Sequence, residues 1–159
     1  MHATISDLEV LDRLHIAQHH AKLNSGCTKV SVGCVVYKKD KLTALGANRT
    51  IPNLCRRKGC LRIAKYGNNS RDHRNPSDCR AIHSEIDAIC KSGVQLRGAT
   101  MYITRYPCEA CARAIVAAGI KYVVYGRQQA ISEETEWIFM HGSVEVEHVT
   151  AFEEDDIVG

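Results

Sequence analysis

From residue 81 to residue 149, segments with helical and strand patterns alternate strictly, and this order leaves few folds open to the chain. The apolar run over residues 121–127 is typical of a strand buried on both faces of a parallel sheet. Alternating strands and helices build a sheet whose faces are covered by helices. The predicted helices span residues 81–93, 108–119 and 131–142, and the predicted strands span residues 99–106, 121–127 and 143–149.

The first third of the chain adds a helix and a hairpin to this pattern. Apolar residues recur at roughly helical spacing over residues 6–22, with Ser6 or Asp7 as the cap. A β-branched segment, residues 30–38, is followed by a polar turn and a second strand candidate, residues 42–48. The predicted order α-β-β-α-β-α-β-α-β gives an α/β fold with a mixed five-stranded sheet and helices on both faces.

Composition narrows the class of protein. A chain of 159 residues with 45% hydrophobic and 25% charged residues is typical of one globular domain, here residues 1–159. No apolar run approaches the ~20 residues that cross a bilayer, and the N-terminus lacks a secretory pattern. The net charge of +3 is far from that of a dedicated nucleic-acid binder. We therefore expect a cytoplasmic protein with no membrane partner and no stable nucleic-acid partner.

Eight cysteines are unusual for a cytoplasmic chain, because the reducing cytoplasm disfavours disulfides. Clustered cysteines in that compartment indicate metal ligands or inert core residues. Cys34 and Cys90 fall in apolar strand and helix patterns, so we expect both in the core. His15 and His19 lie four residues apart on the first helix, but a polar helix face explains them better than a metal site.

Two short strings carry the chemistry, His83-Ser84-Glu85 and Pro107-Cys108-Glu109-Ala110-Cys111. Cys108 and Cys111 share the first turn of a predicted helix, whose free amides and dipole favour thiolates. His83 starts the preceding helix, and successive helices of a β-α-β unit start at the same sheet edge. Three protein ligands that leave one tetrahedral position open are typical of a catalytic Zn²⁺ site.

Glu85 suits the role of a proton shuttle beside that metal. Its place two residues after His83 turns it away from the ligand, so it lies near the zinc without binding it. Hydrolytic deamination needs a carboxylate of this kind, because a ring nitrogen and a leaving amino group must both gain protons. A lone C-x-x-C also occurs in redox motifs and structural zinc sites, whereas H-x-E followed by P-C-x-x-C is the signature of zinc deaminases.

These strings, with Tyr102 and Thr104 ahead of the second, resemble the cytidine deaminase-like family, and within it the deoxycytidylate (dCMP) deaminases. The resemblance covers roughly residues 5–127 and implies a three-layer α-β-α sandwich, His83, Cys108 and Cys111 as zinc ligands, and Glu85 as catalytic residue. It also implies that Asn48, at the end of the second strand, binds the substrate sugar. This chain departs from the family pattern at three positions: Ser84 stands in place of alanine, and arginine occurs at positions 49 and 105. We expect Arg49 and Arg105 to meet a 5′-phosphate or to alter substrate choice. The matching segments are residues 25–36, 55–62, 79–89 and 98–126.

Residues 49–80 form a polar insert that is too long for an unsupported loop in a compact domain. Some dCMP deaminases of this type carry a second, structural zinc in such an insert. By that resemblance Cys27, Cys55, His73 and Cys79 are the second set of ligands, with Cys60 as a possible substitute. Free thiols packed at the base of the insert are the alternative.

The leading hypothesis is zinc-dependent hydrolysis of dCMP to dUMP and ammonia, which supplies dUMP for thymidylate synthesis. The resemblance also implies a homo-oligomer, either a dimer or a hexamer, that acts on a small nucleotide. Deamination of another cytosine or purine nucleoside or nucleotide is one alternative. A non-catalytic zinc-binding relative that acts in DNA uptake is the other, although the presence of Glu85 argues against it.

Overall fold

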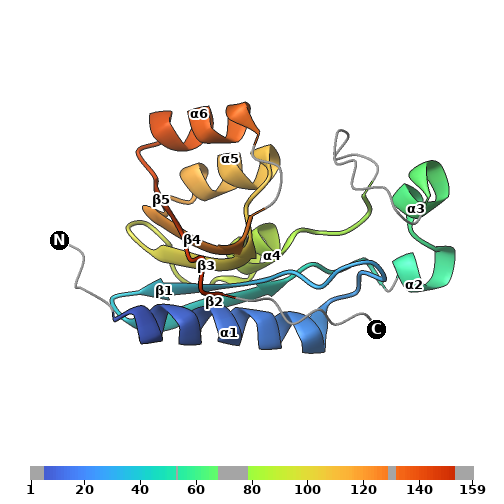
Figure 1. Ribbon diagram of the computed structural model, residues 1–159, viewed down its shortest axis with the longest axis horizontal. Coiled ribbons are helices and arrows are strands. Elements are labelled where there is room, and N and C mark those ends of the chain that lie inside the picture. Colours follow the sequence, from blue (N-terminus) through green and yellow to red (C-terminus); the bar gives the residue numbers. More distant parts are fainter. Residues whose placement is uncertain (1–5, 53, 68–78, 129–131, 153–159) are drawn as a thin grey trace.

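The computed structural model describes residues 6–52, 54–67, 79–128 and 132–152, and a sheet of five strands lies at the centre of this described part (Figure 1). The strand order is β2-β1-β3-β4-β5. β1 pairs antiparallel with β2 and β3, whereas β3, β4 and β5 are parallel, so the predicted mixed sheet is confirmed. The strands are Gly33–Lys38 (β1), Lys41–Ala47 (β2), Thr100–Arg105 (β3), Tyr122–Arg127 (β4) and Glu145–His148 (β5).

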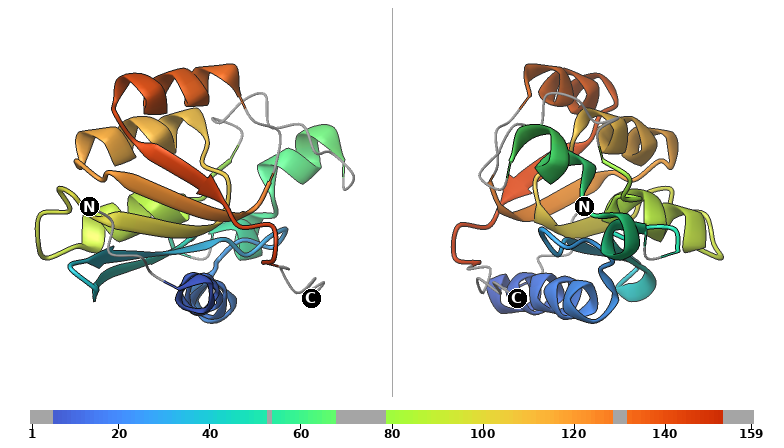
Figure 2. Two further views of the ribbon diagram at one scale, coloured as in Figure 1. Left: turned by 60° about the vertical axis from the view of Figure 1, so that its left-hand side comes forward. Right: turned by 90° about the vertical axis from the view of Figure 1, so that its right-hand side faces the viewer.

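Helices cover both faces of the sheet, which gives the predicted three layers (Figures 1 and 2). α1 lies alone across one face, while α4, α5 and α6 lie on the other (Figure 2). The N-terminus of α1 has a capping box, in which Ser6 and Glu9 each bond the other's backbone amide. The helices are Asp7–Asn24 (α1), Leu54–Lys58 (α2), Leu61–Tyr66 (α3), Ser84–Lys91 (α4), Glu109–Ala117 (α5) and Glu133–His141 (α6).

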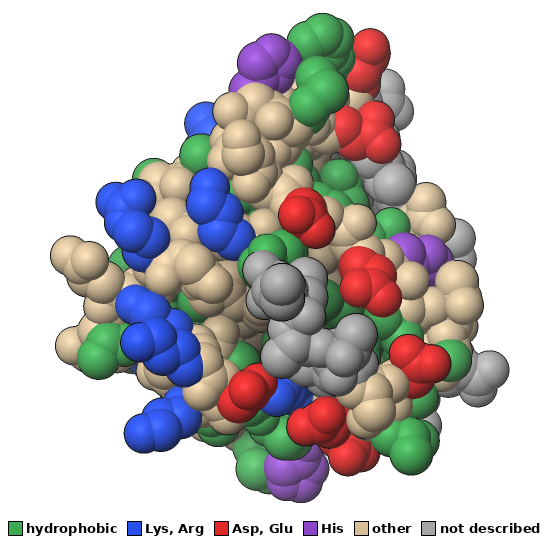
Figure 3. All heavy atoms as spheres, turned by 90° about the vertical axis from the view of Figure 1, so that its left-hand side faces the viewer, with side chains coloured by type: hydrophobic (Ala, Val, Ile, Leu, Met, Phe, Trp, Pro, Cys, Tyr) green, Lys and Arg blue, Asp and Glu red, His purple; other side chains and the backbone are tan. Residues whose placement is uncertain are grey.

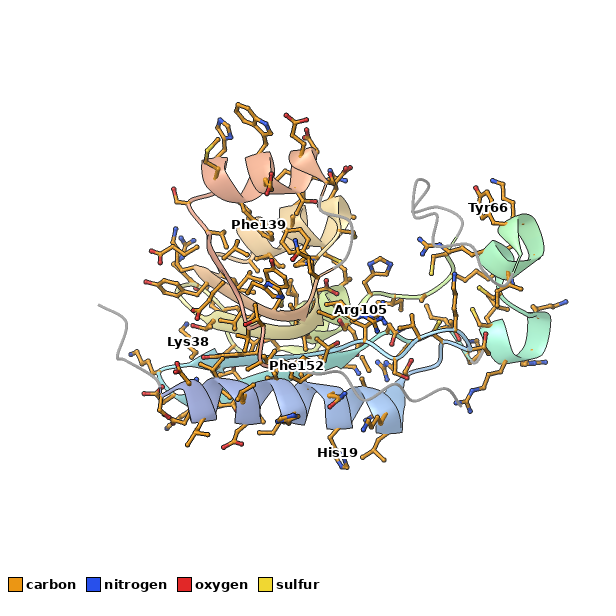
Figure 4. All side chains as sticks on the ribbon, viewed as in Figure 1. His19, Lys38, Tyr66, Arg105, Phe139 and Phe152 are labelled. Atoms are coloured by element: carbon orange, nitrogen blue, oxygen red, sulfur yellow. The ribbon has the colours of Figure 1, made fainter. Side chains whose placement is uncertain are left out.

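Alternation along the central strands divides the core into two parts. Met101 and Ile103 of β3 face α4, α5 and α6, while Tyr102 between them faces α1. Phe139 closes the larger core from α6, and Phe152 closes the smaller one on the opposite side of the sheet (Figure 4). Both faces of the central strands are therefore buried, which explains the uninterrupted apolar run predicted for β4.

The hairpin between β1 and β2 turns on two residues that are not glycine. Lys39 and Asp40 have φ values of 50° and 58°. Positive φ at both central residues defines a type I′ turn, whose twist matches that of the two strands. The tight hairpin sets the register between β1 and β2. In this register the end of β2, with Asn48 just after it, lies near the start of α4.

The insert contains more regular structure than its polar sequence indicates. Two short helices, α2 and α3, lie at the right of Figure 1, beyond the edge of the layered body. Only Cys55 among their residues is buried. Arg80 Nη1 donates to the Gly59 carbonyl oxygen (3.1 Å), which ties the turn between these helices to the segment that enters α4. No helix among the described residues is long and apolar enough to cross a membrane.

Candidate metal centre and active site

The starts of α4 and α5 bring three potential metal ligands together. His83 is the N-cap of α4, Cys108 is the N-cap of α5, and Cys111 lies in the first turn of α5. The Nδ1 atom of His83 is 3.4 Å from the Sγ atom of each cysteine. The ligand atoms of the three residues all lie within 4.8 Å of one another. The residues that the sequence predicts as zinc ligands therefore converge on one point.

Two close contacts of the backbone hold the start of α4 in this position. Gly46 of β2 packs against the helix so closely that a Cβ atom there would overlap the backbone oxygen of Ser84. The Cys34 thiol of β1 donates to the same oxygen (3.1 Å). On the other side, Pro107 leads from β3 into α5, whose first amides are free to stabilise thiolates. The strands thus place both helix starts, and the helix starts place the ligands.

Mutual contacts among the three side chains shift their affinities for protons. Contact with Cys108, and then with Cys79, raises the pKa of His83 to about 10. Contact with Cys111 lowers the pKa of Cys108 to about 3, and the same contact raises the pKa of Cys111. An imidazole and two thiols form a donor set that suits Zn²⁺ and leaves one tetrahedral position open. Because zinc binds the deprotonated ligands, its binding releases the protons held here.

Glu85 lies beside the three ligands and is only 4% exposed. Burial raises the pKa of its carboxyl group. The Ser84 hydroxyl donates to Glu85 Oε2 (3.0 Å), and the carboxyl group also contacts the Cys111 thiol. A buried carboxyl group with a raised pKa is suited to take up and release protons near neutral pH. Glu85 thus lies next to the predicted metal ligands, and its role as proton shuttle stays a prediction.

Asn48 lies immediately after β2 and is 6% exposed. Its carboxamide oxygen accepts hydrogen bonds from the Val32 amide (2.8 Å) and the Ser25 hydroxyl (2.7 Å). Its Nδ2 atom donates to the Val30 carbonyl oxygen (2.8 Å). These bonds fix the loop before β1 and engage one of the two amide protons. The sugar-binding role of Asn48 stays a prediction, and the structure adds a supporting role that sequence reasoning missed.

Arg49 forms an ion pair within the protein, and its predicted role toward a phosphate or in substrate choice stays a prediction. Its Nη2 atom lies 2.7 Å from Asp87 Oδ1, and Asp87 is 4% exposed. Asp87 Oδ2 also accepts from the Ala47 amide (3.1 Å) and from Lys91 Nζ (3.0 Å). Burial acts to raise the pKa of Asp87, but these donors together hold the pKa below its usual value. The ion pair joins the end of β2 to α4, two residues beyond Glu85.

Sequence reasoning also missed Asp87, for which the spacing of four residues to Lys91 was the available signal. Arg105 ends β3 beside Arg127 of β4 in the parallel register. Figure 4 shows Arg105 near the edge of the sheet at which α4 and α5 begin. Its place is compatible with a role in substrate choice, which stays a prediction. Cys34 is buried as expected, but the core prediction for Cys90 is wrong, because α4 turns this thiol outward to solvent.

The cysteines of the insert lie near one another but less tightly. Burial raises the pKa of Cys55, and the nearby thiols of Cys27, Cys60 and Cys79 add to this increase. Cys79 also contacts His83, and this contact lowers the pKa of Cys79. His73 lies outside the described residues. Within the described part of the chain, only His83, Cys108 and Cys111 form a ligand group as tight as 4.8 Å, so the second zinc site stays a prediction.

Comparison with known families agrees with this geometry. Residues 9–127 match the family described as "Cytidine and deoxycytidylate deaminase zinc-binding region". The matched stretch contains the starts of α4 and α5 and all three converging ligands. The chain therefore belongs to this family of zinc-binding deaminases.

Individual relatives point to the same group. The chain is 35% identical over 140 residues to ComE operon protein 2 of Bacillus subtilis, covering 84% of this chain and 68% of that protein. It is 33% identical over 142 residues to deoxycytidylate deaminase of Saccharomyces cerevisiae, covering 87% of this chain but 44% of the yeast enzyme. A deoxycytidylate deaminase of Mycobacterium phage D29 is 31% identical over 117 residues, covering 68% of this chain and 87% of the phage enzyme.

Solved structures confirm the fold. The dCMP deaminase of cyanophage S-TIM5, solved in complex with dCMP and dUMP, superposes with a TM-score of 0.66 at 22% identity, covering 91% of this chain and 99% of that one. The bifunctional deaminase and reductase from Thermotoga maritima, which acts as a diaminohydroxyphosphoribosylaminopyrimidine deaminase, superposes with a TM-score of 0.62 at 23% identity. That match covers 89% of this chain and 36% of the other. At these identities the likeness establishes the cytidine deaminase-like fold alone.

Proposed function

We propose that this protein is a zinc-dependent deaminase that hydrolyses dCMP to dUMP and ammonia and so supplies dUMP for thymidylate synthesis. The observation that carries the proposal is the convergence of His83, Cys108 and Cys111 beside the buried carboxyl group of Glu85. Relatives named deoxycytidylate deaminase at 31–33% identity support the choice of reaction.

In this mechanism the zinc ion would be held by the three converging side chains and would have one role. When bound by His83, Cys108 and Cys111, zinc supplies Lewis acidity, which lowers the pKa of water at the site. The protein supplies the proton transfers through Glu85. Its carboxylate takes a proton as the oxygen of water adds to C4 of cytosine, and it delivers that proton to N3. It then carries the hydroxyl proton of the adduct to the amino group, which leaves as ammonia.

Because Glu85 would both accept and return protons, its burial and its hydrogen bond from Ser84 suit this role. A carboxyl group must be basic enough to accept a proton and acidic enough to return it, and burial raises its pKa toward that balance. The hydrogen bond from Ser84 and the contact with the Cys111 thiol hold the carboxyl group beside the predicted ligands. One residue then serves all the proton transfers of the reaction.

We propose that the substrate is a nucleotide rather than a nucleoside. Asn48 is the candidate for contact with the sugar, through its second amide proton. Arg105 is the remaining candidate for the 5′-phosphate, since Arg49 is paired with Asp87. The S-TIM5 relative that was solved with dCMP and dUMP supports this substrate class.

A second, structural zinc held by Cys27, Cys55, His73 and Cys79 is also proposed, with Cys60 as a possible substitute. The support is the proximity of the thiols of Cys27, Cys60 and Cys79 to that of Cys55. A closed site of thiolates and one imidazole would convert binding energy into folding energy for the insert, whose two described helices, α2 and α3, bury Cys55 alone.

The setting that we propose is one deaminase domain, acting in the cytoplasm as a homo-oligomer, either a dimer or a hexamer. The substrate is its small-molecule partner, and neither nucleic acid nor membrane is needed for activity. The modest net charge of +3 supports the exclusion of a nucleic-acid substrate.

A substrate panel tests the proposal directly. Ammonia release is measured with zinc-loaded protein and dCMP, CMP, deoxycytidine, cytidine, dCTP and guanine. Turnover of dCMP with the highest kcat/KM is the expected result. A preference for deoxycytidine or guanine would assign a different deaminase, and no turnover of any of them would indicate a non-catalytic relative.

A further inference from the structure

The charge of the chain is unevenly distributed, and the metal centre does not account for this. Residues 49–80 contain nine of the 21 lysines and arginines but two of the 18 acidic residues, so the insert carries a net charge of +7 and the rest of the chain −4. Residues 68–78 are neutral overall, with two arginines and two aspartates. The positive excess therefore belongs to the parts of the insert that the structure describes.

Five of these cations belong to the two short helices of the insert. Three of them occupy consecutive positions in α2, and all three are exposed. α3 adds two more, and residues 54–66 contain no acidic residue. These five side chains are called the basic surface of the insert: Arg56, Arg57, Lys58, Arg62 and Lys65.

The basic surface lies at the edge of the molecule where the catalytic helices begin. The right-hand view of Figure 2 shows α2 and α3 in front of this edge. Arg80, which bonds the turn between α2 and α3, directly follows Cys79, and Cys79 contacts His83. Figure 4 shows Arg105, the candidate for the 5′-phosphate, on the side of the layered body that faces Tyr66 of α3. The insert is therefore a close neighbour of the metal centre.

The start of α6, by contrast, is acidic. Its first turn carries three exposed carboxylates, those of Glu133, Glu134 and Glu136. Its N-cap, Ser132, donates a hydrogen bond to Glu109 Oε1 at the start of α5 (2.6 Å), so these acids also lie near the metal centre. The edge thus carries positive charge at the insert and negative charge at α6, and an anion that approaches it is attracted toward the insert.

We propose that the basic surface of the insert guides a nucleotide to the metal centre through its 5′-phosphate and so selects nucleotides over nucleosides, an inference that rests on the proposed function. A phosphate monoester carries a charge of about −1.5 to −2 at pH 7, whereas a nucleoside is neutral. Positive potential beside a site raises the local concentration and the association rate of an anion by about 10- to 10³-fold. The effect needs no direct contact between α2 and the phosphate.

A basic surface can also bind nucleic acid, but single-stranded nucleic acid needs aromatic side chains on which its bases stack. Tyr66, which is 40% exposed, is the one aromatic residue of α2 and α3. Lys65 Nζ already lies over its ring, 5.3 Å from the centroid. The surface therefore suits a mononucleotide better, and nucleic-acid binding becomes the alternative that the experiment must separate.

Salt-dependent kinetics of charge variants test the proposal. kcat and kcat/KM are measured with zinc-loaded protein for dCMP and for deoxycytidine, the uncharged control substrate, at ionic strengths of about 10 and 150 mM. In the variant Arg56→Gln/Arg57→Gln/Lys58→Gln, kcat/KM for dCMP should fall ~10-fold at the lower ionic strength and ~2-fold at the higher one, because salt screens the charges. kcat for dCMP and kcat/KM for deoxycytidine should stay within ~2-fold of the parent.

A matched control removes three cations at the other end of the sheet. Lys41, Arg97 and Lys121 are exposed, and they lie at or just before the starts of β2, β3 and β4. Figure 3 shows lysine and arginine side chains gathered on this end of the molecule. The variant Lys41→Gln/Arg97→Gln/Lys121→Gln has the same net charge as the insert variant, but its kcat/KM for dCMP should change by no more than ~2-fold. An equal loss in both variants would assign the effect to net charge and overturn the proposal.

Binding of dUMP gives a readout without turnover. Its Kd, measured by calorimetry, should rise ~10-fold in the insert variant at an ionic strength of about 10 mM. Failure of the proposed function has a different signature, because the parent itself then releases no ammonia from dCMP.

Four outcomes would overturn the guiding role of the insert. They are no binding of dUMP by the parent, unchanged dCMP kinetics and dUMP affinity in the insert variant, an equal loss for deoxycytidine, and a loss confined to the binding of a single-stranded oligonucleotide.

Discussion

Two groups of cysteines, one before and one after His83 in the chain, differ in how the fold brings their members together. Cys108 and Cys111 share the first turn of α5, directly after a central strand of the sheet. Cys27, Cys55 and Cys79 come from three separate segments that only the fold brings near one another. In the first group one helix turn fixes the spacing of the two thiols, whereas in the second group the spacing depends on tertiary contacts between separate segments. The comparison separates a ligand group that one helix turn preforms from a group whose order would come in part from the proposed second zinc.

The largest expected effect is loss of a catalytic ligand. Cys108→Ser and Cys111→Ser should each remove the zinc and reduce dCMP turnover by more than ~10⁴-fold, since both metal and water activation are lost. Metal content by plasma mass spectrometry and ammonia release are the two measurements. Cys90→Ser is the matched control, because this thiol is exposed on α4, and it should change neither quantity. A Cys111→Ser protein with full activity would show that the preformed group is not the active site.

The second effect separates the metal from the proton shuttle. Glu85→Gln keeps the size and burial of the side chain but removes its ability to transfer protons. We expect a loss in kcat of ~10²–10⁴-fold or more, with zinc content and thermal stability retained. Less than a tenfold loss would mean that another group moves the protons.

The third effect concerns the insert cysteines. Cys55→Ser or Cys79→Ser should lower the zinc content from two ions to one per chain and lower the melting temperature by several degrees. Turnover should fall less than tenfold, and indirectly, because Cys79 lies four residues before His83 and contacts it. One zinc per chain in the parent, unchanged in both variants, would mean that these thiols are free and that the insert packs by other means.

The smallest expected effect on turnover is at Asp87, which braces α4 without reaching the reacting atoms. Asp87→Asn should reduce the free energy of unfolding by about 1–2 kcal/mol at pH 7, because charged donors from Arg49 and Lys91 lose an ionised acceptor. Since the donors hold the pKa of Asp87 below its unfolded value, this stability is present above the unfolded pKa and is lost as pH falls through the folded pKa. Denaturant unfolding at pH 7 and near pH 3 should therefore show the gap between parent and variant narrowing in acid. A gap that widens in acid would contradict the sign of the shift.

The contrast between the two cysteine groups also shows which features could be predicted from the sequence alone. α5, β4 and the converging ligands follow from local signals, namely Pro107, the apolar strand pattern and the C-x-x-C spacing. The core location predicted for Cys90 failed because one turn of a short helix decides which face is covered. Arg49 was expected to meet a 5′-phosphate or to alter substrate choice, and that prediction is still open. Its pairing with Asp87 was not predicted, because it depends on the position of β2 against α4 and no sequence spacing encodes that contact.

The insert contains structure that the sequence analysis did not predict. Its polar composition predicts a loop, yet α2 and α3 form within it, and Cys55 is the one buried residue of these two helices. The hydrogen bonds of the Asn48 carboxamide are equally invisible in sequence, since Ser25, Val30 and Val32 lie 16 to 23 residues away. Long-range polar contacts and the two short helices of the insert are therefore what the sequence analysis did not predict.

The most direct test of the central claim is the rate of dUMP formation from dCMP as a function of bound zinc. Protein is stripped with a chelator under reducing conditions and reloaded stepwise, and rate and zinc content are measured on the same samples. The account predicts that the parent regains activity in proportion to zinc bound at His83, Cys108 and Cys111, while Cys108→Ser regains none. Full dCMP deamination by zinc-free protein, or no dUMP from fully loaded protein, would contradict it.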